Sequence, residues 1–249
     1  MSAHIEALAR LTVRVGANIA PGQTVVLNAK LGQEPLARAL TAACYQAGAH
    51  QVEVHYADPY VQRARLQHAP EESLGEVIPW VRQRPGQLAE MQGALISLSG
   101  PAAPGLLDDI EPARIGRDTV ALMEWAKVID EASVNWTIVP GPNPAWAKLV
   151  FPELEEPDAV AELWKQIGHI CRLDEPDPLA AWWERSAELA RAAGRLDAAQ
   201  LDALHFRGLG TDLTLGLLPG VRWAGGRVRN GVGAKAHPQC PDRGGVHQP

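Results

Sequence analysis

The sequence predicts an α/β fold: an open, mostly parallel sheet with helices on both faces, followed by a helical extension and a C-terminal β-hairpin. Two observations carry this prediction. Short apolar runs typical of buried strands alternate with segments whose apolar residues have helical spacing. Later in the chain the spacing becomes almost entirely helical, until two short alternating runs flank a pair of glycines. The 249 residues, 46% of them hydrophobic and 21% charged, are typical of a globular protein with a substantial core.

The first half of the chain alternates one helix with one strand. Turn residues such as Pro21-Gly22 and Gly48 separate each helix from the strand that follows it. Because parallel strands need long crossover connections, four short strands separated by helices predict parallel pairing. The predicted helix and strand pairs cover residues 8–15 and 24–27, 36–47 and 51–56, 74–81 and 94–98, and 120–129 and 134–139.

The second half predicts the helical extension and the hairpin. Helical spacing covers residues 159–171, 179–194 and 198–204, and the two hairpin strands cover 204–207 and 211–217. We expect an N-terminal α/β domain over residues 1–229 and an irregular tail over 230–249. That tail is rich in glycine and proline and has no apolar periodicity.

Charge and cysteine content disfavour several classes of protein. Lys and Arg number 23 against 29 Asp and Glu, and a net charge of −6 is poorly suited to binding a phosphate backbone. No run approaches the roughly 20 apolar residues of a membrane helix. Cys44, Cys171 and Cys240 lie far apart, which predicts free thiols in a reducing compartment. We therefore expect a cytoplasmic protein with no nucleic-acid or membrane partner.

Two short motifs resemble catalytic or cofactor loops only in part. Gly208 and Gly210 could begin a dinucleotide fingerprint, but the third glycine is missing and a strand-like run follows where a helix should start. A hairpin explains these glycines better. Ser97 and Ser99 end a predicted strand, yet the sequence around them lacks the first glycine of a nucleophile elbow. We interpret them as ordinary loop serines.

Carboxylates, histidines and tryptophans form no compact site in the sequence. The pairs Glu71-Glu72, Asp108-Asp109 and Glu155-Glu156 place neighbours that do not point at one centre, and the first pair favours a helix start after a proline. No set of histidines has a recognised zinc spacing. The isolated histidines are His50, His55, His68 and His169, the last of which lies two positions before Cys171. In the tail, His237, Cys240 and His247 form a weakly supported metal set. Six tryptophans are expected mostly to pack between helices: Trp136, Trp146, Trp164, Trp182, Trp183 and Trp223.

Several long strings, in order along the chain, resemble the N-terminal domain of the dimetal aminopeptidases of the thermophilic aminopeptidase, or aminopeptidase T, family. They are PGQTVVLNAK at 21–30, AGAHQVEVHYAD at 47–58, RARLQHAPEESL at 63–74, VNWTIVPGPNPAWAKLVFPEL at 134–154, and FRGLGTDLTLGL with RWAGG up to 226. The resemblance implies a two-domain peptidase. Its C-terminal domain would hold two divalent metal ions, zinc, cobalt or manganese, that activate water against an N-terminal peptide bond. It also implies peptide substrates and a homodimer.

The chain departs from that family where the metal ligands should begin. Shortly after RWAGG, relatives carry a Pro-Thr-Glu-Glu-Val-Phe-Thr segment with the first acidic ligand, whereas this chain has no glutamate after Glu188. No catalytic, cofactor or metal residue is therefore assigned, and we expect this chain to bind no metal. Asp212 is the only acidic residue of the matching hairpin, and hairpin structure or contact with the missing domain explains it as well as chemistry does.

Three functional interpretations follow. The first is a metal-dependent aminopeptidase truncated to its N-terminal domain and inactive alone; the second is a non-catalytic binding or dimerisation module; the third is a small-molecule binder at the carboxyl ends of the strands. A shift of the reading frame would explain the truncation. With permitted codons for residues 236–248, reading one nucleotide later yields Pro-Thr-Glu-Glu-Val-Phe-Thr. We therefore expect a frameshift between about residues 226 and 236.

Overall fold

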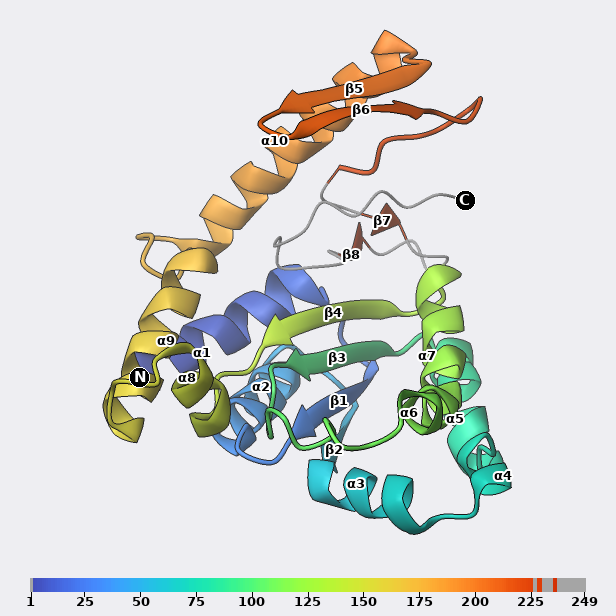
Figure 1. The fold of residues 1–249 in the computed structure, drawn as a ribbon. Helices are drawn as coiled ribbons and strands as arrows, with labels where there is room; N and C mark the ends of the chain where they lie inside the picture. The colour runs from blue at the N-terminus through green and yellow to red at the C-terminus, as the bar shows by residue number, and fades with distance from the viewer. Residues whose placement is uncertain (1, 226–227, 230–234, 237–249) are drawn as a thin grey trace.

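The predicted parallel sheet is confirmed. The computed structural model describes residues 2–225, 228–229 and 235–236. Four strands pair in the order β2-β1-β3-β4, all parallel (Figure 1). Each predicted strand is present, and β1 extends three residues further than expected. Their bounds are Thr24–Lys30 for β1, Gln51–Ala57 for β2, Ala94–Ser99 for β3 and Asn135–Pro140 for β4.

Helices cover both faces of this sheet, as predicted. Helix α1 (Ser2–Leu11), the π-helical turn η1 (Thr12–Gly16) and α2 (Glu34–Gln46) share a core with Val25 and Leu27. On the opposite face, α5 (Pro79–Glu90) and α7 (Val120–Asp130) pack with Val26 and Leu95. Neighbouring residues of a strand point to opposite faces, so burial of both faces explains the continuous apolar runs in β1 and β3.

Three helices were not predicted, and two helix predictions were wrong. The missed helices are α3 (Pro59–His68), α6 (Pro112–Asp118) and α8 (Pro144–Val150), whereas α4 (Glu71–Leu74) begins after Pro70 as expected. The single helix expected over residues 74–81 is broken between α4 and α5. Ile78 precedes a proline and is extended, with ψ 136°, because a residue before proline is disfavoured in the helical region. Helices α3, α5, α6 and α8 all begin at a proline, whose fixed φ suits the first turn.

The helical extension consists of α9 (Glu156–Ile170) and α10 (Pro178–Ala199). Helix α10 continues through Gly194, where a break was expected, because one glycine costs only about 1 kcal/mol in a helix. The helix predicted over residues 198–204 is wrong. Gln200 adopts the left-handed conformation, with φ 46°, and ends α10. Trp164 and Trp182 are buried as expected, while Trp183 is 39% exposed.

The predicted hairpin is confirmed as β5 (Ala203–Gly208) and β6 (Thr211–Gly216). Gly210 has φ +73° in the connecting turn, a conformation that favours glycine. The hairpin lies at the far end of α10, away from the parallel sheet (Figure 1). Two short strands, β7 (Val228–Arg229) and β8 (Lys235–Ala236), pair antiparallel, so one strand lies within the tail predicted to be irregular. The rest of that tail lies outside the described residues.

No helix in the described part of the chain is both long and apolar enough to span a membrane.

Candidate functional site

The carboxyl edge of the sheet is the first place to look for a ligand site. In open α/β sheets, ligands bind outside the carboxyl ends of neighbouring strands whose connections leave toward opposite faces. Here β1 leads into α2 on one face, while β3 leads toward α7 on the other. The crevice between them is therefore where the third interpretation, a small-molecule binder, expects its pocket.

The side chain of Gln33 fills that position. Its Nε2 donates to the carbonyl oxygens of Ser99 at 2.9 Å and Gly141 at 2.8 Å, and its Oε1 accepts from the backbone N–H of Lys30 at 2.8 Å. Gln33 is only 1% exposed, and a Cβ on Gly141 would lie 2.6 Å from its Nε2. Beside it, Lys30 Nζ donates to the carbonyl of Gly100 at 2.8 Å. The protein's own polar groups therefore satisfy one another at this edge. No sequence motif marked Gln33, whose only signal is its position between the first strand and the helix that follows.

The two candidate serines are strand residues rather than loop residues, because β3 extends through Ser99. Ser97 Oγ lies 3.4 Å from the amide nitrogen of Asn28, and Ser99 Oγ donates to the carbonyl of Val139 at 3.3 Å. A catalytic serine needs a general base within hydrogen-bond reach, and these partners are an amide and a carbonyl. Both serine hydroxyls therefore form hydrogen bonds with neighbouring strands of the sheet.

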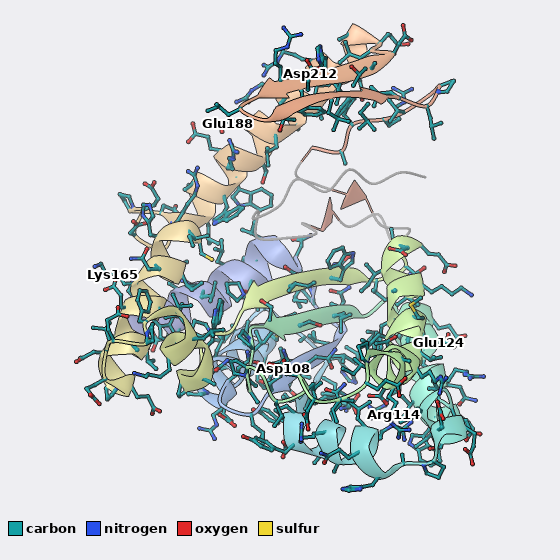
Figure 2. All side chains as sticks on the ribbon, viewed as in Figure 1. Asp108, Arg114, Glu124, Lys165, Glu188 and Asp212 are labelled. Carbon is teal, nitrogen blue, oxygen red and sulfur yellow. The ribbon has the colours of Figure 1, made fainter. Side chains whose placement is uncertain are left out.

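The candidate carboxylates do not converge. Figure 2 shows Asp108, Glu188 and Asp212 on separate parts of the fold. Glu155 and Glu156 lie at the start of α9, where negative charge complements the helix dipole. Asp212 pairs with His205 at 2.7 Å and with Arg207 at 3.5 Å across the hairpin. Asp212 was interpreted either as part of the hairpin structure or as a contact with a further domain. These ion pairs favour the role in the hairpin.

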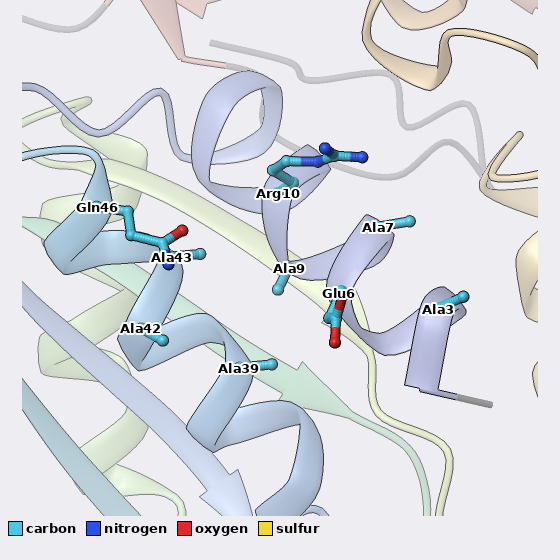
Figure 3. A pocket seen from close by; sticks show the side chains of 9 residues that line it. All are labelled: Ala3, Glu6, Ala7, Ala9, Arg10, Ala39, Ala42, Ala43 and Gln46. Atoms are coloured by element: carbon cyan, nitrogen blue, oxygen red, sulfur yellow. The ribbon is translucent and has the colours of Figure 1, made fainter.

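A groove of about 630 Å³ is lined by residues of α1 and α2 (Figure 3). Six of its nine lining residues are alanines, and the polar ones are Glu6, Arg10 and Gln46. Small side chains let two helices approach closely, but they supply neither a nucleophile nor a metal-binding set. The groove is therefore a packing feature and offers no chemistry by itself.

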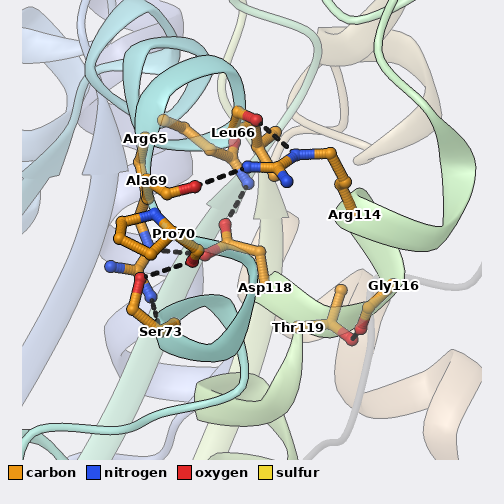
Figure 4. Close-up of polar contacts among 10 residues, drawn as sticks. Arg65, Leu66, Ala69, Pro70, Ser73, Arg114, Gly116, Asp118 and Thr119 are labelled. Atoms are coloured by element: carbon orange, nitrogen blue, oxygen red, sulfur yellow. Dashed lines mark hydrogen bonds and ion pairs between the residues drawn. The ribbon is translucent and has the colours of Figure 1, made fainter.

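Arginines hold α3 and α4 against the segment around α6 (Figure 4). Arg114 donates to the carbonyls of Leu66 at 2.7 Å and Ala69 at 2.8 Å, and Arg65 pairs with Asp118 at 2.8 Å. Carbonyl groups at the end of a helix lack intrahelical partners, so these contacts satisfy the end of α3.

Two of the candidate carboxylates join the same arginine-rich region. The Arg63 guanidinium, hydrogen-bonded to both carboxylate oxygens of Asp109, lowers the pKa of that carboxyl. Glu71, in the first turn of α4 as expected, pairs with Arg117. Both contacts explain these carboxylates as structural.

The histidines are also dispersed. His169 at the end of α9 pairs with Asp174 at 2.9 Å, and this bond lowers the pKa of the Asp174 carboxyl. His55 on β2 lies 3.3 Å from Glu53. Within the described residues, no three His, Cys, Asp or Glu side chains come together as a group that could hold a metal ion. The tail candidates His237, Cys240 and His247 lie outside the described residues.

Comparison with known proteins decides the family. A family model described as thermophilic metalloprotease (M29) matches residues 1–244. The chain belongs to the M29 family. This M29 chain is 36% identical over 242 residues to aminopeptidase T of Thermus thermophilus, and 35% identical over 242 residues to aminopeptidase 2 of Geobacillus stearothermophilus. These alignments cover 96% and 95% of the chain, but only 59% and 58% of the relatives.

A solved structure of wild-type AmpT from Thermus thermophilus has the same fold as the M29 chain. The TM-score is 0.86 at 34% sequence identity, and the match covers 95% of this chain and 59% of AmpT. The family resemblance found in the sequence is therefore confirmed. The chain spans about three fifths of the length of these relatives, so about two fifths of each relative lies outside the match.

The family name implies a metal ion, and the residues described here do not fit one. A two-metal hydrolase needs several carboxylate or histidine ligands directed at one centre. Asp109, Asp118, Asp174 and Asp212 instead pair with arginines or histidines at separate places, and no metal-binding group forms among the described residues. No metal ligand is therefore assigned to it.

Proposed function

We propose that this chain is the N-terminal, non-catalytic part of a metal-dependent aminopeptidase and does not hydrolyse peptides by itself. Membership of the M29 family supports the aminopeptidase reaction, the removal of N-terminal amino acids from peptides. The family description as a metalloprotease supports metal-dependent chemistry, and two zinc, cobalt or manganese ions bound in the part of the relatives outside the match belong to this proposal. A cytoplasmic location, suited to the buried free thiol of Cys44, belongs to the same proposal.

An activity assay tests this proposal. The purified chain is incubated with a chromogenic amino-acid amide and added cobalt, zinc or manganese, and aminopeptidase T of Thermus thermophilus serves as the active control. We expect the control alone to show turnover that a chelator abolishes, because water activation needs a bound metal. Chelator-sensitive turnover by the chain itself, well above the blank, would refute the proposal.

A non-catalytic binding or dimerisation module is the second candidate function. The observation that favours it is the set of exposed apolar side chains on the hairpin, Phe206, Leu213 and Leu215. A homodimer, implied by the family resemblance, is part of this candidate. Sedimentation measurements of the chain at several concentrations distinguish a stable dimer from a monomer.

A further inference from the structure

Helices α3, α4 and α6 pack on one another outside the two apolar cores of the sheet. Leu66 is the buried residue of α3, Leu74 is that of α4, and every residue of α6 is at least partly exposed. Among the described residues, neither leucine belongs to the cores on the two faces of the sheet. Because burial of apolar surface is the main favourable contribution to folding, these helices have little of it to hold them in place.

Side chains of α3 bind two carboxylates from the segment that follows β3. Arg63 donates to both carboxylate oxygens of Asp109, at 2.5 and 2.7 Å. Arg65 donates to Asp118 at 2.8 Å, and Gln62 donates to the other oxygen of the same carboxylate at 3.3 Å. The Asp118 side chain is only 13% exposed, so water can replace these partners only when α3 and α6 separate.

Side chains of α6 bind in turn to α3 and α4. Arg114 donates to the carbonyl oxygens of Leu66 and Ala69, at 2.7 and 2.8 Å (Figure 4). Arg117 pairs with Glu71 in the first turn of α4. Contacts of arginine therefore join residues 59–74 to residues 106–118, two segments that α5 and β3 separate in the sequence. We call these two segments the arginine-clamped unit.

We propose that the arginine-clamped unit opens cooperatively while the sheet stays folded, and that ionic strength controls how often it opens. Its helices have 10, 4 and 7 residues, fewer than the roughly 12 to 15 that an isolated helix needs, so all three lose support when the contacts break. The opening lies next to the carboxyl ends of β2 and β3, which lead into the two segments of the unit.

The ion pairs of the unit are open to screening by salt. The side chains of Asp109, Glu71 and Arg117 are 64%, 56% and 47% exposed. Ion pairs exposed to this extent contribute little to stability, and dissolved salt weakens them further. The screening length falls from about 10 Å in 0.1 M salt to about 3 Å in 1 M salt. Added salt therefore weakens the contacts between the two segments and leaves the apolar cores of the sheet intact.

Hydrogen exchange of the whole chain at two salt concentrations tests the opening. Exchange is measured for peptides covering α3, α6 and β1, in about 0.05 M and about 1 M sodium chloride. At low salt the amides of α3 and α6 should exchange at least about tenfold faster than those of β1. At high salt both helices should gain a further, equal factor of about three or more. The exchange of β1 in the same samples shows that the sheet is folded.

Two substitutions remove contacts at separate places in the unit. Asp118→Asn removes the charge that α3 binds at the end of α6, and Asp109→Asn removes the charged partner of Arg63. Because the unit opens cooperatively, each substitution should speed exchange severalfold in both α3 and α6 and leave β1 unchanged. Glu188→Gln is the matched control, since it removes a carboxylate whose partner Arg185 lies in the same helix, at 3.1 Å. It should leave the exchange of α3 and α6 unchanged.

Three results would overturn the proposal. Exchange of α3 and α6 as slow as that of β1 would show that these helices open only when the whole fold unfolds. Unequal effects of salt or of either substitution on the two helices would show that they open separately. Rates that do not change with salt would show that ion pairs do not control the opening. None of these measurements depends on peptide hydrolysis, so the proposed function is tested independently.

Discussion

Gln33 Nε2 donates a hydrogen bond of 2.8 Å to the carbonyl oxygen of Gly141, a residue 108 positions later in the chain. The bond connects the segment after β1 with the segment after β4, two strands that are separated in the sheet by β3. Since the same nitrogen also reaches the end of β3 at Ser99, one amide group ties three strand ends together.

Replacing Gln33 by leucine should destabilise the fold by about 2–3 kcal/mol. The leucine has a similar volume, but it leaves the Lys30 N–H without its acceptor and removes one donor from each of the carbonyls of Ser99 and Gly141. A buried group left unsatisfied costs about 1–3 kcal/mol. Chemical denaturation measures the effect. Gln83→Leu, on an exposed position of α5, is the matched control and should change stability by less than about 0.5 kcal/mol. Equal stability of the two variants would contradict the role given to Gln33.

Replacing Trp182 by phenylalanine should cost about 1–3 kcal/mol. The indole Nε1 donates to the carbonyl of Cys171 at 2.8 Å inside the core, and phenylalanine removes this donor together with part of the buried ring. The neighbour Trp183 is 39% exposed, so Trp183→Phe should have a clearly smaller effect. Thermal unfolding of both variants provides the comparison, and a larger loss for Trp183→Phe would contradict it.

Cys44 should make the protein less stable at alkaline pH. Burial raises the pKa of its thiol from the usual 9.0 to about 12. Above pH 9 the unfolded chain loses this proton while the folded chain keeps it, so the free energy of unfolding falls as pH rises. Between pH 8 and pH 10 the loss due to this thiol should be about 1 kcal/mol. Denaturation of the parent and of Cys44→Ala at both pH values isolates it, and identical pH dependence would disprove it.

A neighbouring reading frame should encode the Pro-Thr-Glu-Glu-Val-Phe-Thr segment that the family resemblance implies. Residues 236–248 are compatible with Pro-Thr-Glu-Glu-Val-Phe-Thr when read one nucleotide later, and the shift leaves the outer bases of each new codon largely determined. Resequencing of the locus provides the measurement. We expect a frameshift between about residues 226 and 236 and a peptidase reading frame downstream. A neighbouring frame that does not encode this segment, or that ends at once, would eliminate the frameshift.

Local periodicity predicted most of the regular structure. The four strands, the helices on both sides of the sheet and the hairpin each carry a pattern of apolar residues that a few neighbouring positions contain. The predictions failed where that information was weak. The break at Ile78 depends on the following proline, and the passage of α10 through Gly194 depends on the helix around it.

The sequence by itself determined the fold class and the family, because strand and helix periods and long matching strings are properties of the chain alone. Only the tertiary structure decided that Gln33 fills the carboxyl edge of the sheet, since its partners lie 66 and 108 positions away. The same is true of the pairing of Arg63 with Asp109, which lies 46 positions later in the chain. Partners this far apart meet only in the folded structure, because helix and strand periods relate positions a few residues apart.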